Sequence, residues 1–503
     1  MSYYLGLDIG TSSTKAILID TKGKIIANVT SHYDFQTPKP LWAESNPSDW
    51  WNATKDCLTQ ILKDTKAEEI KGIGLTGQMH GLVVLDKDGE VIRPCMMWND
   101  QRTQEQCDEV YTTIGKEEYI KITGNQVLTG FTVPKLLWLR KYEPENYAKI
   151  DKILLPKDYI RYKLSGTYSS DVSDASGTGL LEVKERTWSK VVLEKLDISE
   201  EILPSLYESV EISSHVSASA AQETSLLERT PITAGAGDQA AQAVGCGIAK
   251  EGIISATFGT SGVVFAHSKE YTSLEDGSLH SFCSAVPGEW HLMGVMLSAA
   301  GSFQWYKDQL GYEESDKEEK EGINAFTSLL EDAEQTPVGS EGLFFLPYLS
   351  GERTPYADPL VRASFIGLTQ KHTKAHMTRA VVEGITYGMK DLLALVNKAG
   401  VTSKVVIASG GGTKSDFWLQ MMADIFETQI KTVNASEGAA FGAALLATVG
   451  TKAYDTVEQA CQAVIKETKS VNTSPYAFFY KNQHALYQKL YPALKDHYVR
   501  INE

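Results

Sequence analysis

The sequence predicts an α/β protein made of two similar lobes. Two segments far apart in the chain, residues 4–19 and 253–266, share one pattern: an apolar strand runs into Gly-Thr-Ser and turns into a second apolar strand. This pattern is typical of a tight β-hairpin, whose glycine permits positive φ and whose hydroxyl and amide groups form an anion-sized pocket at the tip. At 503 residues, the chain also exceeds the size at which one hydrophobic core stops growing. Both observations indicate a repeated lobe.

The first lobe is predicted to open with three antiparallel strands, then a helix and another strand. The helix begins after Asn46, because Asn is a favoured N-cap, Pro47 suits the first helical position and apolar residues then recur at helical spacing. The strands cover residues 4–9, 15–19, 24–30 and 71–76. This order is that of a ribonuclease-H-like lobe, the building block of the actin, sugar kinase and Hsp70 superfamily.

The second lobe is predicted to start near Gly252 with the second hairpin. Later in the chain come a strand, a glycine turn and an amphipathic helix, at residues 405–408, 409–413 and 417–426. We therefore expect two ribonuclease-H-like lobes with a central cleft. Residues 1–247 would form one lobe and residues 248–503 the other.

Composition excludes several classes of protein. The net charge of −16 argues against a nucleic-acid surface or an anionic membrane, because phosphate-rich partners are held by basic stripes. The apolar runs are far too short to span a bilayer and the N-terminus lacks a secretory signal, so we expect a cytoplasmic protein. The six cysteines are widely spaced, with no Cys-x-x-Cys, so we expect reduced core thiols rather than zinc ligands or disulfides.

Only the first hairpin carries a carboxylate before its glycine. Asp8 could cap a turn, but next to Gly10-Thr11-Ser12 the pattern favours an acid on the metal side of a phosphate site. Such a carboxylate can hold Mg²⁺, directly or through water, because Mg²⁺ usually takes one or two carboxylates plus phosphate oxygens. Lys15 could help with phosphate charge or could be a solvated strand residue.

A second acid follows the small, glycine-rich segment at residues 233–237. Little bulk surrounds Asp238, so a substrate can approach closely, and the helix expected to begin at Gln239 or Ala240 would present its positive end nearby. Phosphoryl transfer uses one positioned carboxylate to accept the proton of the attacking hydroxyl. Asp238 is the candidate for this role, which is compatible with its also being an N-cap.

Polar residues after the strand at 71–76 indicate a site for a small polyol. Gln78 and His80 flank a methionine at an exposed strand end, where both can donate hydrogen bonds. Trp98 offers an aromatic face suited to a sugar, while Arg102 nearby could be an ion-pair partner. The glycines at 410–412 have the composition of an adenine or ribose platform, and a helix N-terminal turn explains them equally well.

Taken together, these segments resemble the FGGY carbohydrate kinases over nearly the whole chain. The most specific are Gly-Gln-Met-His-Gly at 77–81 and Leu-Pro-Tyr-Leu-Ser-Gly-Glu-Arg-Thr-Pro at 346–355, together with residues 6–12, 97–100, 154–159 and 170–178. The resemblance implies two lobes, with the sugar deep in the cleft, ATP mainly on the C-terminal lobe and closure on binding. It also implies that Mg-ATP phosphorylates D-xylulose at O5, giving D-xylulose 5-phosphate.

On this template each matched residue has an implied role. Asp238 matches the base that deprotonates the terminal hydroxyl, and Asp8 matches the acid on the Mg²⁺ side. The sugar contacts expected from the residues and the resemblance are Gln78, Met79, His80, Trp98, Asp238 and Gln239. The nucleotide contacts expected in the same way are Gly10, Thr11, Ser12, Gly259, Thr260, Ser261, Gln304, Gly411, Gly412, Thr413 and Asp416.

Gln239 departs from the pattern of the relatives that act on D-xylulose. Those relatives commonly have Asn after the catalytic Asp, whereas relatives that act on glycerol have Gln, as here. A mispaired buried polar group can cost orders of magnitude in discrimination, so this residue bears on the substrate. The relatives that act on glycerol, however, have Arg-Glu where this chain has Met79-His80. This difference in the substrate loop outweighs the single exchange of Gln for Asn at position 239.

Other functions fit parts of the sequence. Another kinase of the family could act on L-ribulose, gluconate, glycerol or a deoxyketose. The same fold serves actin-like filaments and ATP-driven chaperones, and a catalytically dead sugar sensor is a third alternative. The acid at Asp238 beside a sugar-type loop favours the kinase. The tyrosine-rich tail could be core or the interface of a homodimer, and periodicity does not choose between them.

Overall fold

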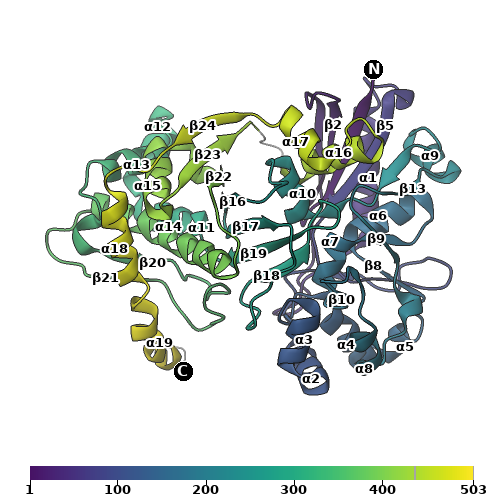
Figure 1. The fold of residues 1–503 in the computed structure, drawn as a ribbon, viewed down its shortest axis with the longest axis horizontal. Helices are drawn as coiled ribbons and strands as arrows, with labels where there is room; N and C mark the ends of the chain where they lie inside the picture. Colours follow the sequence, from purple (N-terminus) through teal and green to yellow (C-terminus); the bar gives the residue numbers. More distant parts are fainter. Residues whose placement is uncertain (435–437, 502–503) are drawn as a thin grey trace. The chain divides into compact units, whose positions relative to one another are not determined.

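A computed structural model describes residues 1–434 and 438–501 (Figure 1). Residue contacts divide the chain into two compact units. The first comprises Met1–Lys250, His267–His291 and Ala435–Lys466, and the second comprises Glu251–Ala266, Leu292–Asn434 and Glu467–Glu503. The long opening stretch thus changes unit at residue 250, near the predicted boundary, while two later segments group with the first unit.

The first unit is built on a mixed sheet with strand order β13-β14-β5-β1-β2-β3, in which β15 also pairs with β5. The predicted antiparallel meander and the parallel strand after the helix are confirmed. The bounds are β1 Tyr3–Ile9, β2 Ser13–Asp20, β3 Ile25–His32, β5 Ile70–Gly77, β13 Ile212–His215, β14 Pro231–Thr233 and β15 Ala236–Gly237. Helix α1, Pro47–Ile61, begins with proline at its first position as expected.

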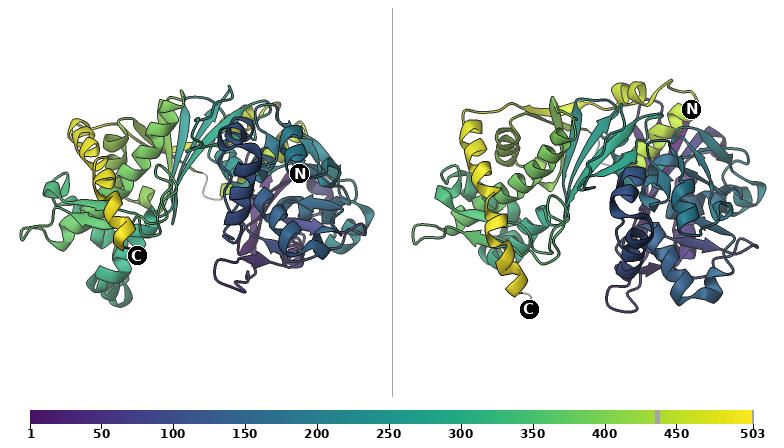
Figure 2. Two further views of the ribbon diagram at one scale, coloured as in Figure 1. Left: turned by 90° about the horizontal axis from the view of Figure 1, so that it is seen from below. Right: turned by 60° about the horizontal axis from the view of Figure 1, so that its bottom comes forward.

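Helix α16 (Gly438–Gly450) packs directly on β1 and β5 of this sheet; Figure 1 labels it close to β2 and β5, and the right-hand view of Figure 2 shows the yellow-green helix beside the purple N-terminal strands. Glycines make the contact possible. A Cβ at Gly6 would overlap the carbonyl oxygen of Ala440, and one at Gly442 would overlap that of Ala241 in helix α10 (Asp238–Gly245). The backbones of α16, β1 and α10 therefore touch, and an added methyl group would have no space.

The remaining elements of the first unit lie outside this sheet. The helices are α2 Gln104–Ile114, α3 Lys116–Thr123, α4 Thr132–Tyr142, α5 Pro144–Tyr147, α6 Pro156–Ser165, α7 Val172–Ala175, α8 Lys190–Lys195, α9 Ala218–Thr224 and α17 Val457–Val464. The short strands are β4 Glu44–Ser45, β6 Val83–Leu85, β7 Cys95–Met96, β8 Lys152–Leu154, β9 Ser169–Asp171, β10 Leu181–Glu182, β11 Thr187–Trp188, β12 Ser205–Tyr207 and β18 His280–Cys283.

The sheet that carries the second unit has the order β18-β19-β17-β16-β22-β23-β24. The predicted second hairpin is confirmed as β16 (Ile253–Phe258) and β17 (Gly262–Ser268), and β22 (Val405–Gly410) runs parallel to β16. The other strands are β19 Trp290–Met296, β20 Phe344–Leu346, β21 Ser364–Ile366, β23 Gln429–Val433 and β24 Glu467–Val471. The helices are α11 Ala300–Leu310, α12 Tyr312–Glu321, α13 Ala325–Glu334, α14 Lys374–Lys398, α15 Asp416–Phe426, α18 Ala477–Tyr487 and α19 Leu490–Ile501.

The tyrosine-rich tail belongs to the core of the second unit. The spaced tyrosines Tyr480, Tyr487, Tyr491 and Tyr498 are all buried, so their periodicity reflects packing within the chain. The helical run is interrupted between α18 and α19, at residues 488–489, and Pro492 occupies the first turn of α19. A proline is tolerated there because the first N–H groups of a helix have no partner within it.

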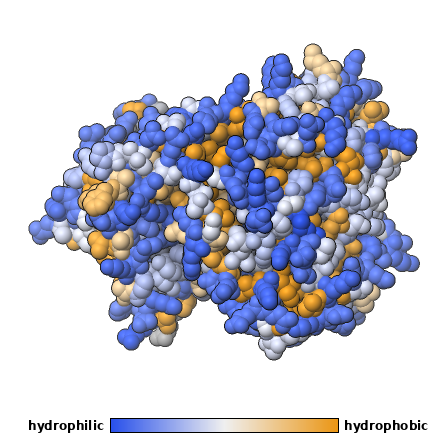
Figure 3. Space-filling view, in the orientation of Figure 1, coloured by the Kyte–Doolittle hydropathy of each residue, from blue (hydrophilic) through white to orange (hydrophobic). Residues whose placement is uncertain are grey.

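Over the described ranges 1–434 and 438–501, no helix is long and apolar enough to cross a bilayer. Figure 3 shows hydrophilic residues over most of the face in view. All six cysteines are buried free thiols, as expected, and burial raises the pKa of Cys95 and Cys107 to about 12. Such thiols are unreactive near neutral pH.

Candidate active site

Three parallel strands of the first sheet end side by side. Asp8 in β1 is level with Thr76 in β5, and β15 pairs with the same residues of β5, Ala236 with Thr76 and Gly237 with Gly77. The carboxyl ends of adjacent parallel strands lie at one edge of a sheet. The register therefore gathers three motifs that are far apart in the sequence: the first hairpin tip, the loop after β5 and the acid that begins α10.

Burial raises the pKa of both predicted acids. Burial raises the pKa of Asp8 to about 6, and the positive charge of Lys15 opposes the rise. Burial, and then the negative charge of Asp8, raise the pKa of Asp238 to about 7, against hydrogen bonds from Gln239. A carboxylate with a pKa near neutrality is suited to accept a proton in this range.

Gln78 holds the first hairpin tip. Its amide nitrogen donates to the carbonyl oxygen of Gly10 at 3.0 Å, and the Tyr33 hydroxyl donates to the same oxygen at 2.8 Å. The indole N–H of Trp98 donates to Thr11 Oγ1 at 3.0 Å. The side chain of Gln78 is buried, and its Oε1 has no hydrogen-bond partner among the described residues. Gln78 and Trp98, both expected to contact the sugar, therefore also hold the first hairpin, which is the one predicted to contact phosphate.

His80 adopts a left-handed backbone conformation, with φ of 69°. Its ring stacks on Phe131 with the centroids 4.6 Å apart, and its Nδ1 lies 2.6 Å from the carbonyl oxygen of Gly177. Its own carbonyl oxygen accepts hydrogen bonds from Thr132 Oγ1 at 3.1 Å and from Lys135 Nζ at 2.9 Å. A non-glycine residue at positive φ needs such support, so the loop is held in one shape.

Lys135 and Phe131 are supports that the sequence predictions did not include. Lys135 is fully buried, and it also donates to the carbonyl oxygen of Gly130 at 2.7 Å. Burial lowers the pKa of Lys135 to about 7. A lysine among the apolar residues of a helix is the signal that could have revealed it, because an unpaired buried lysine is costly.

Met79 lies against the strand that leads to Asp238. A Cβ added at Gly237 would be 2.9 Å from Met79 Sδ, and one added at Gly177 would be 3.0 Å from Met79 Cε. Glycine at both positions leaves room for the methionine. This contact joins the loop after β5 to the start of α10.

Arg102 belongs to a structural ion-pair cluster. Its Nη2 lies 2.5 Å from Asp100 Oδ2 and 2.8 Å from Glu44 Oε1, and its guanidinium stacks over Trp42 at 3.5 Å. Asp100 Oδ2 also accepts the backbone N–H of Ala43 at 2.8 Å. The alternative of an ion-pair partner is therefore confirmed for Arg102.

The second unit contains a large cavity at the tip of its own hairpin. The cavity has a volume of about 1140 Å³. Six of the predicted nucleotide residues line it: Gly259, Thr260, Gln304, Gly411, Gly412 and Asp416. Of the other predicted residues, Ser261 and Thr413 are adjacent in sequence to this lining, while Gly10, Thr11 and Ser12 lie in the first unit. The structure thus gathers the two glycine segments that the sequence separates by about 150 positions.

The lining is suited to a flat ring attached to a polar group. It includes the aromatic residues Phe258, Phe303, Trp305, Phe326, Phe417 and Trp418. A Cβ at Gly411 would meet open space, and one at Gly412 would lie 3.1 Å from the ring of Trp418. Gln304 Nε2 is 2.8 Å from both carboxylate oxygens of Asp308. Glycine at positions 411 and 412 leaves this part of the lining without side chains.

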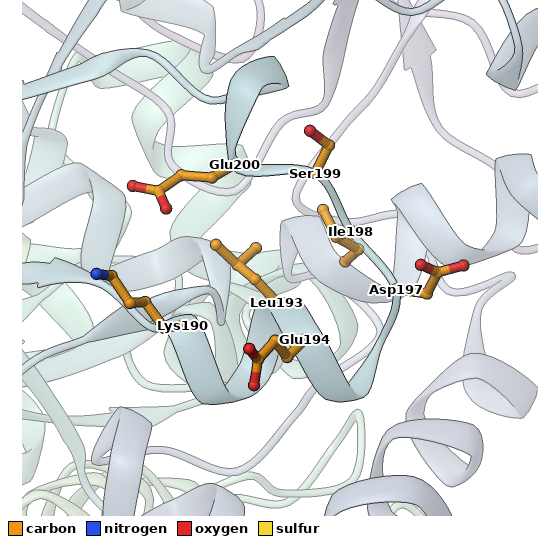
Figure 4. Close-up of a pocket in the computed structure, with 7 residues that line it drawn as sticks. All are labelled: Lys190, Leu193, Glu194, Asp197, Ile198, Ser199 and Glu200. Carbon is orange, nitrogen blue, oxygen red and sulfur yellow. The ribbon is translucent and has the colours of Figure 1, made fainter.

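A smaller hollow of about 450 Å³ lies elsewhere in the first unit. Figure 4 shows its lining, which comes from α8 and the turn after it. Three of the lining residues, Glu194, Asp197 and Glu200, are acidic, and none of the predicted site residues is among them. This hollow is not part of the candidate active site.

Metal ligands are sparse. Among the residues that the structure describes, no group of three or more His, Cys, Asp or Glu side chains is arranged to hold a metal ion. Asp8 therefore does not belong to an all-protein metal cage. A site with one or two carboxylates fits a cation that takes its other ligands from phosphate and water.

Comparisons with known proteins agree with this architecture. Models of the N-terminal and C-terminal domains of the FGGY family of carbohydrate kinases match residues 3–245 and 254–451. The chain is 37% identical to a protein named xylulose kinase from Bacillus subtilis, covering 99% of this chain and 98% of that protein. It is also 37% identical to the xylulose kinase of Escherichia coli, covering 98% and 100%.

A solved structure is similar over the full length. The ligand-bound xylulose kinase from Lactobacillus acidophilus superimposes with a TM-score of 0.92 and 27% identity, covering 100% of both chains. Fold and site together define a two-lobed carbohydrate kinase. The chain belongs to the FGGY family of carbohydrate kinases, which confirms the predicted fold class and family.

Proposed function

We propose that the protein transfers the γ-phosphoryl group of ATP to O5 of D-xylulose, giving D-xylulose 5-phosphate, which is the xylulokinase reaction. The observation that carries this proposal is the common strand edge of β1, β5 and β15, where Asp8, the Met79-His80 loop and Asp238 lie together in an FGGY chain. The full-length relatives named xylulose kinase support the choice of sugar.

Asp238 is the proposed general base. Its carboxylate would accept the proton of the sugar hydroxyl as that oxygen attacks the γ-phosphorus. Met79 and His80 would orient the sugar, with the buried support of Lys135 and Phe131 fixing the loop. Gln239, which hydrogen-bonds to Asp238, would contact a substrate hydroxyl and hold the carboxylate. The remaining sugar contacts proposed are Gln78 and Trp98.

The cavity of the second unit is the proposed site for adenosine. Gln304, Gly411, Gly412, Thr413 and Asp416 would contact the nucleotide, with Gly259, Thr260 and Ser261 at its phosphates. Gly10, Thr11 and Ser12 would contact the transferring phosphate. The aromatic, glycine-walled lining supports this assignment.

Mg²⁺ fits the residues at the strand edge. Burial raises the pKa of both Asp8 and Asp238, the negative charge of Asp8 raises that of Asp238 further, and a nearby cation would favour the charged form of both carboxyls. Bound beside Asp8, Mg²⁺ would neutralise charge on the ATP phosphates during transfer. We place the reaction in the cytoplasm, since all six cysteines are unpaired thiols.

The test of the proposed function is a coupled ADP-release assay with D-xylulose, L-ribulose, D-gluconate, glycerol, 1-deoxy-D-xylulose or no sugar. We expect the highest kcat/KM with D-xylulose, little turnover without sugar, and phosphorus on O5 by NMR. Gluconate is disfavoured because Arg102, the cation considered for its carboxylate, is bound by Asp100 and Glu44. A higher kcat/KM for another polyol would identify that polyol as the substrate in place of D-xylulose. ATP turnover independent of sugar would contradict the assignment as a sugar kinase.

The rate should depend on pH through Asp238. Because the free protein's Asp238 has a pKa of about 7, the reactive carboxylate form is lost as the pH falls below that value. We expect kcat/KM for D-xylulose to fall about tenfold per pH unit on the acidic side. The measurement is a profile from pH 5.5 to 8.5, with circular dichroism at each pH to show that the fold persists. A flat profile down to pH 5.5 would exclude Asp238 as the base.

A further inference from the structure

A cluster of fully buried charged side chains lies next to the segment that precedes α10. It consists of Lys157, Asp158, Arg161, Asp171 and Asp174, whose side chains have no exposed surface. Lys157 Nζ lies 2.5 Å from Asp158 Oδ1, 2.9 Å from Asp171 Oδ1 and 3.3 Å from Asp174 Oδ2. Burial raises the pKa of Asp174 well above its usual value, and the positive charge of Lys157 opposes that rise. Nothing in the proposed chemistry uses these residues.

The segment at 233–237, which leads to Asp238, is hydrogen-bonded at both of its ends by the cluster and by the neighbouring Ser173. Arg161 donates from Nη1 to the carbonyl oxygen of Thr233 at 2.7 Å and from Nη2 to that of Ala234. At the other end, the backbone N–H of Gly237 donates to Ser173 Oγ at 3.2 Å. Gly237 is the residue immediately before Asp238.

Asp171 fixes the hydroxyl that receives the Gly237 N–H. Its Oδ2 accepts the Ser173 hydroxyl at 2.5 Å, the Ser173 N–H at 2.8 Å and the Ser209 hydroxyl at 3.2 Å. Its Oδ1 lies against Lys157. Because the hydrogen of Ser173 Oγ is committed to Asp171, the oxygen lone pairs of Ser173 are left to face Gly237. The hydroxyl therefore has one orientation, and it reaches the peptide before the proposed base.

We propose that Ser173 and Asp171 are positioning residues for Asp238. They hold the Gly237 peptide, and through it the carboxylate, in place for proton transfer; this proposal rests on the proposed function. A displacement of about 1 Å can cost a reaction about 10²-fold when geometry is otherwise optimal. The effect of Ser173 should therefore appear in kcat rather than in nucleotide binding, because the adenosine cavity is formed by residues of the second unit.

The test compares Ser173→Ala with Ser176→Ala. Ser176 is a matched control: it is as deeply buried, donates to the carbonyl oxygen of Val172 and accepts the N–H of Cys283, but makes no contact with the segment at 233–238 in any hydrogen bond of its own. We expect Ser173→Ala to lower kcat about 10- to 100-fold with KM for ATP unchanged, and Ser176→Ala to keep kcat within about threefold. Asp171→Asn should resemble Ser173→Ala.

A double-mutant cycle separates positioning from general loosening. If Ser173 acts through Asp238, then Ser173→Ala should cost nothing further in an Asp238→Asn background, measured in single turnovers. Equal losses of kcat in Ser173→Ala and Ser176→Ala, or additive losses in the cycle, would overturn the proposal. So would an unchanged kcat in Ser173→Ala. Failure of the proposed function looks different: Asp238→Asn would itself retain turnover.

Discussion

Asp238→Asn is expected to lower kcat for D-xylulose by about 10³-fold or more while the protein becomes more stable at pH 8. Asn keeps the shape of the side chain but cannot accept the proton, and general-base removal typically costs 10²- to 10⁴-fold. Burial and the charge of Asp8 hold the pKa of Asp238 at about 7, above the value in an unfolded chain. At pH 8 the folded protein therefore carries an unfavourable charge, which Asn removes.

The sign of the stability change identifies the cause of the lost activity. A group whose pKa is raised by folding binds its proton more tightly in the folded state, so stability falls as the pH rises from about 4 through about 7, and the loss is complete above that range. The gain from Asp238→Asn should shrink as the pH is lowered from 8 toward 5. Thermal unfolding at both pH values and binding of a fluorescent ATP analogue are the measurements. Turnover within tenfold of the parent, or a large loss of stability, would contradict the assignment.

Gly442→Ala is expected to destabilise the first unit by about 3 kcal/mol, which is the upper range for overpacking a rigid site. A Cβ at this position would overlap the carbonyl oxygen of Ala241, which is backbone and cannot rotate away. The opposite result would follow from helix propensity alone, since replacing a helical glycine by alanine usually gains about 1 kcal/mol. The sign of the change in melting temperature therefore decides between the two effects.

The control for this substitution is Ser219→Ala at an exposed position of α9 in the same unit. It raises helix propensity without adding an atom near backbone, so its melting temperature should equal or exceed that of the parent. Gly442→Ala should also lower kcat, because α10 begins at Asp238 and its backbone touches α16. A melting temperature at or above that of the parent would show that the two helices separate without cost.

Much of the local structure could be predicted from the sequence. The hairpins, the helix after Asn46 and the glycine turn before α15 follow from apolar alternation, capping residues and glycine placement, all of which act over a few residues. The burial of the tail tyrosines follows from their spacing only once the helices are packed. Lys135 was missed because a lysine within an apolar helix has no local signature of its partner carbonyls, which come from a distant loop.

The grouping of Ala435–Lys466 with the first unit also had no local signal. Its small residues suit many environments. Glycine is needed at positions 6 and 442 only because helix α16 approaches β1 and α10 closely. Similarly, the buried cluster around Lys157 combines residues from α6, β9 and α7. Their charges would be read as solvated if each segment were considered alone.

By itself, the sequence determined two glycine hairpins, a pair of acids and the family pattern that joins them. The tertiary structure alone decided that Asp8, the Met79-His80 loop and Asp238 lie at one strand edge, and that a buried cluster contacts the segment before Asp238. The physical reason is that β15 and β14 pair with β5 across a gap of about 160 residues, as in the contact of Thr233 with Ile73. Such register depends on packing of the whole unit, which no local pattern specifies.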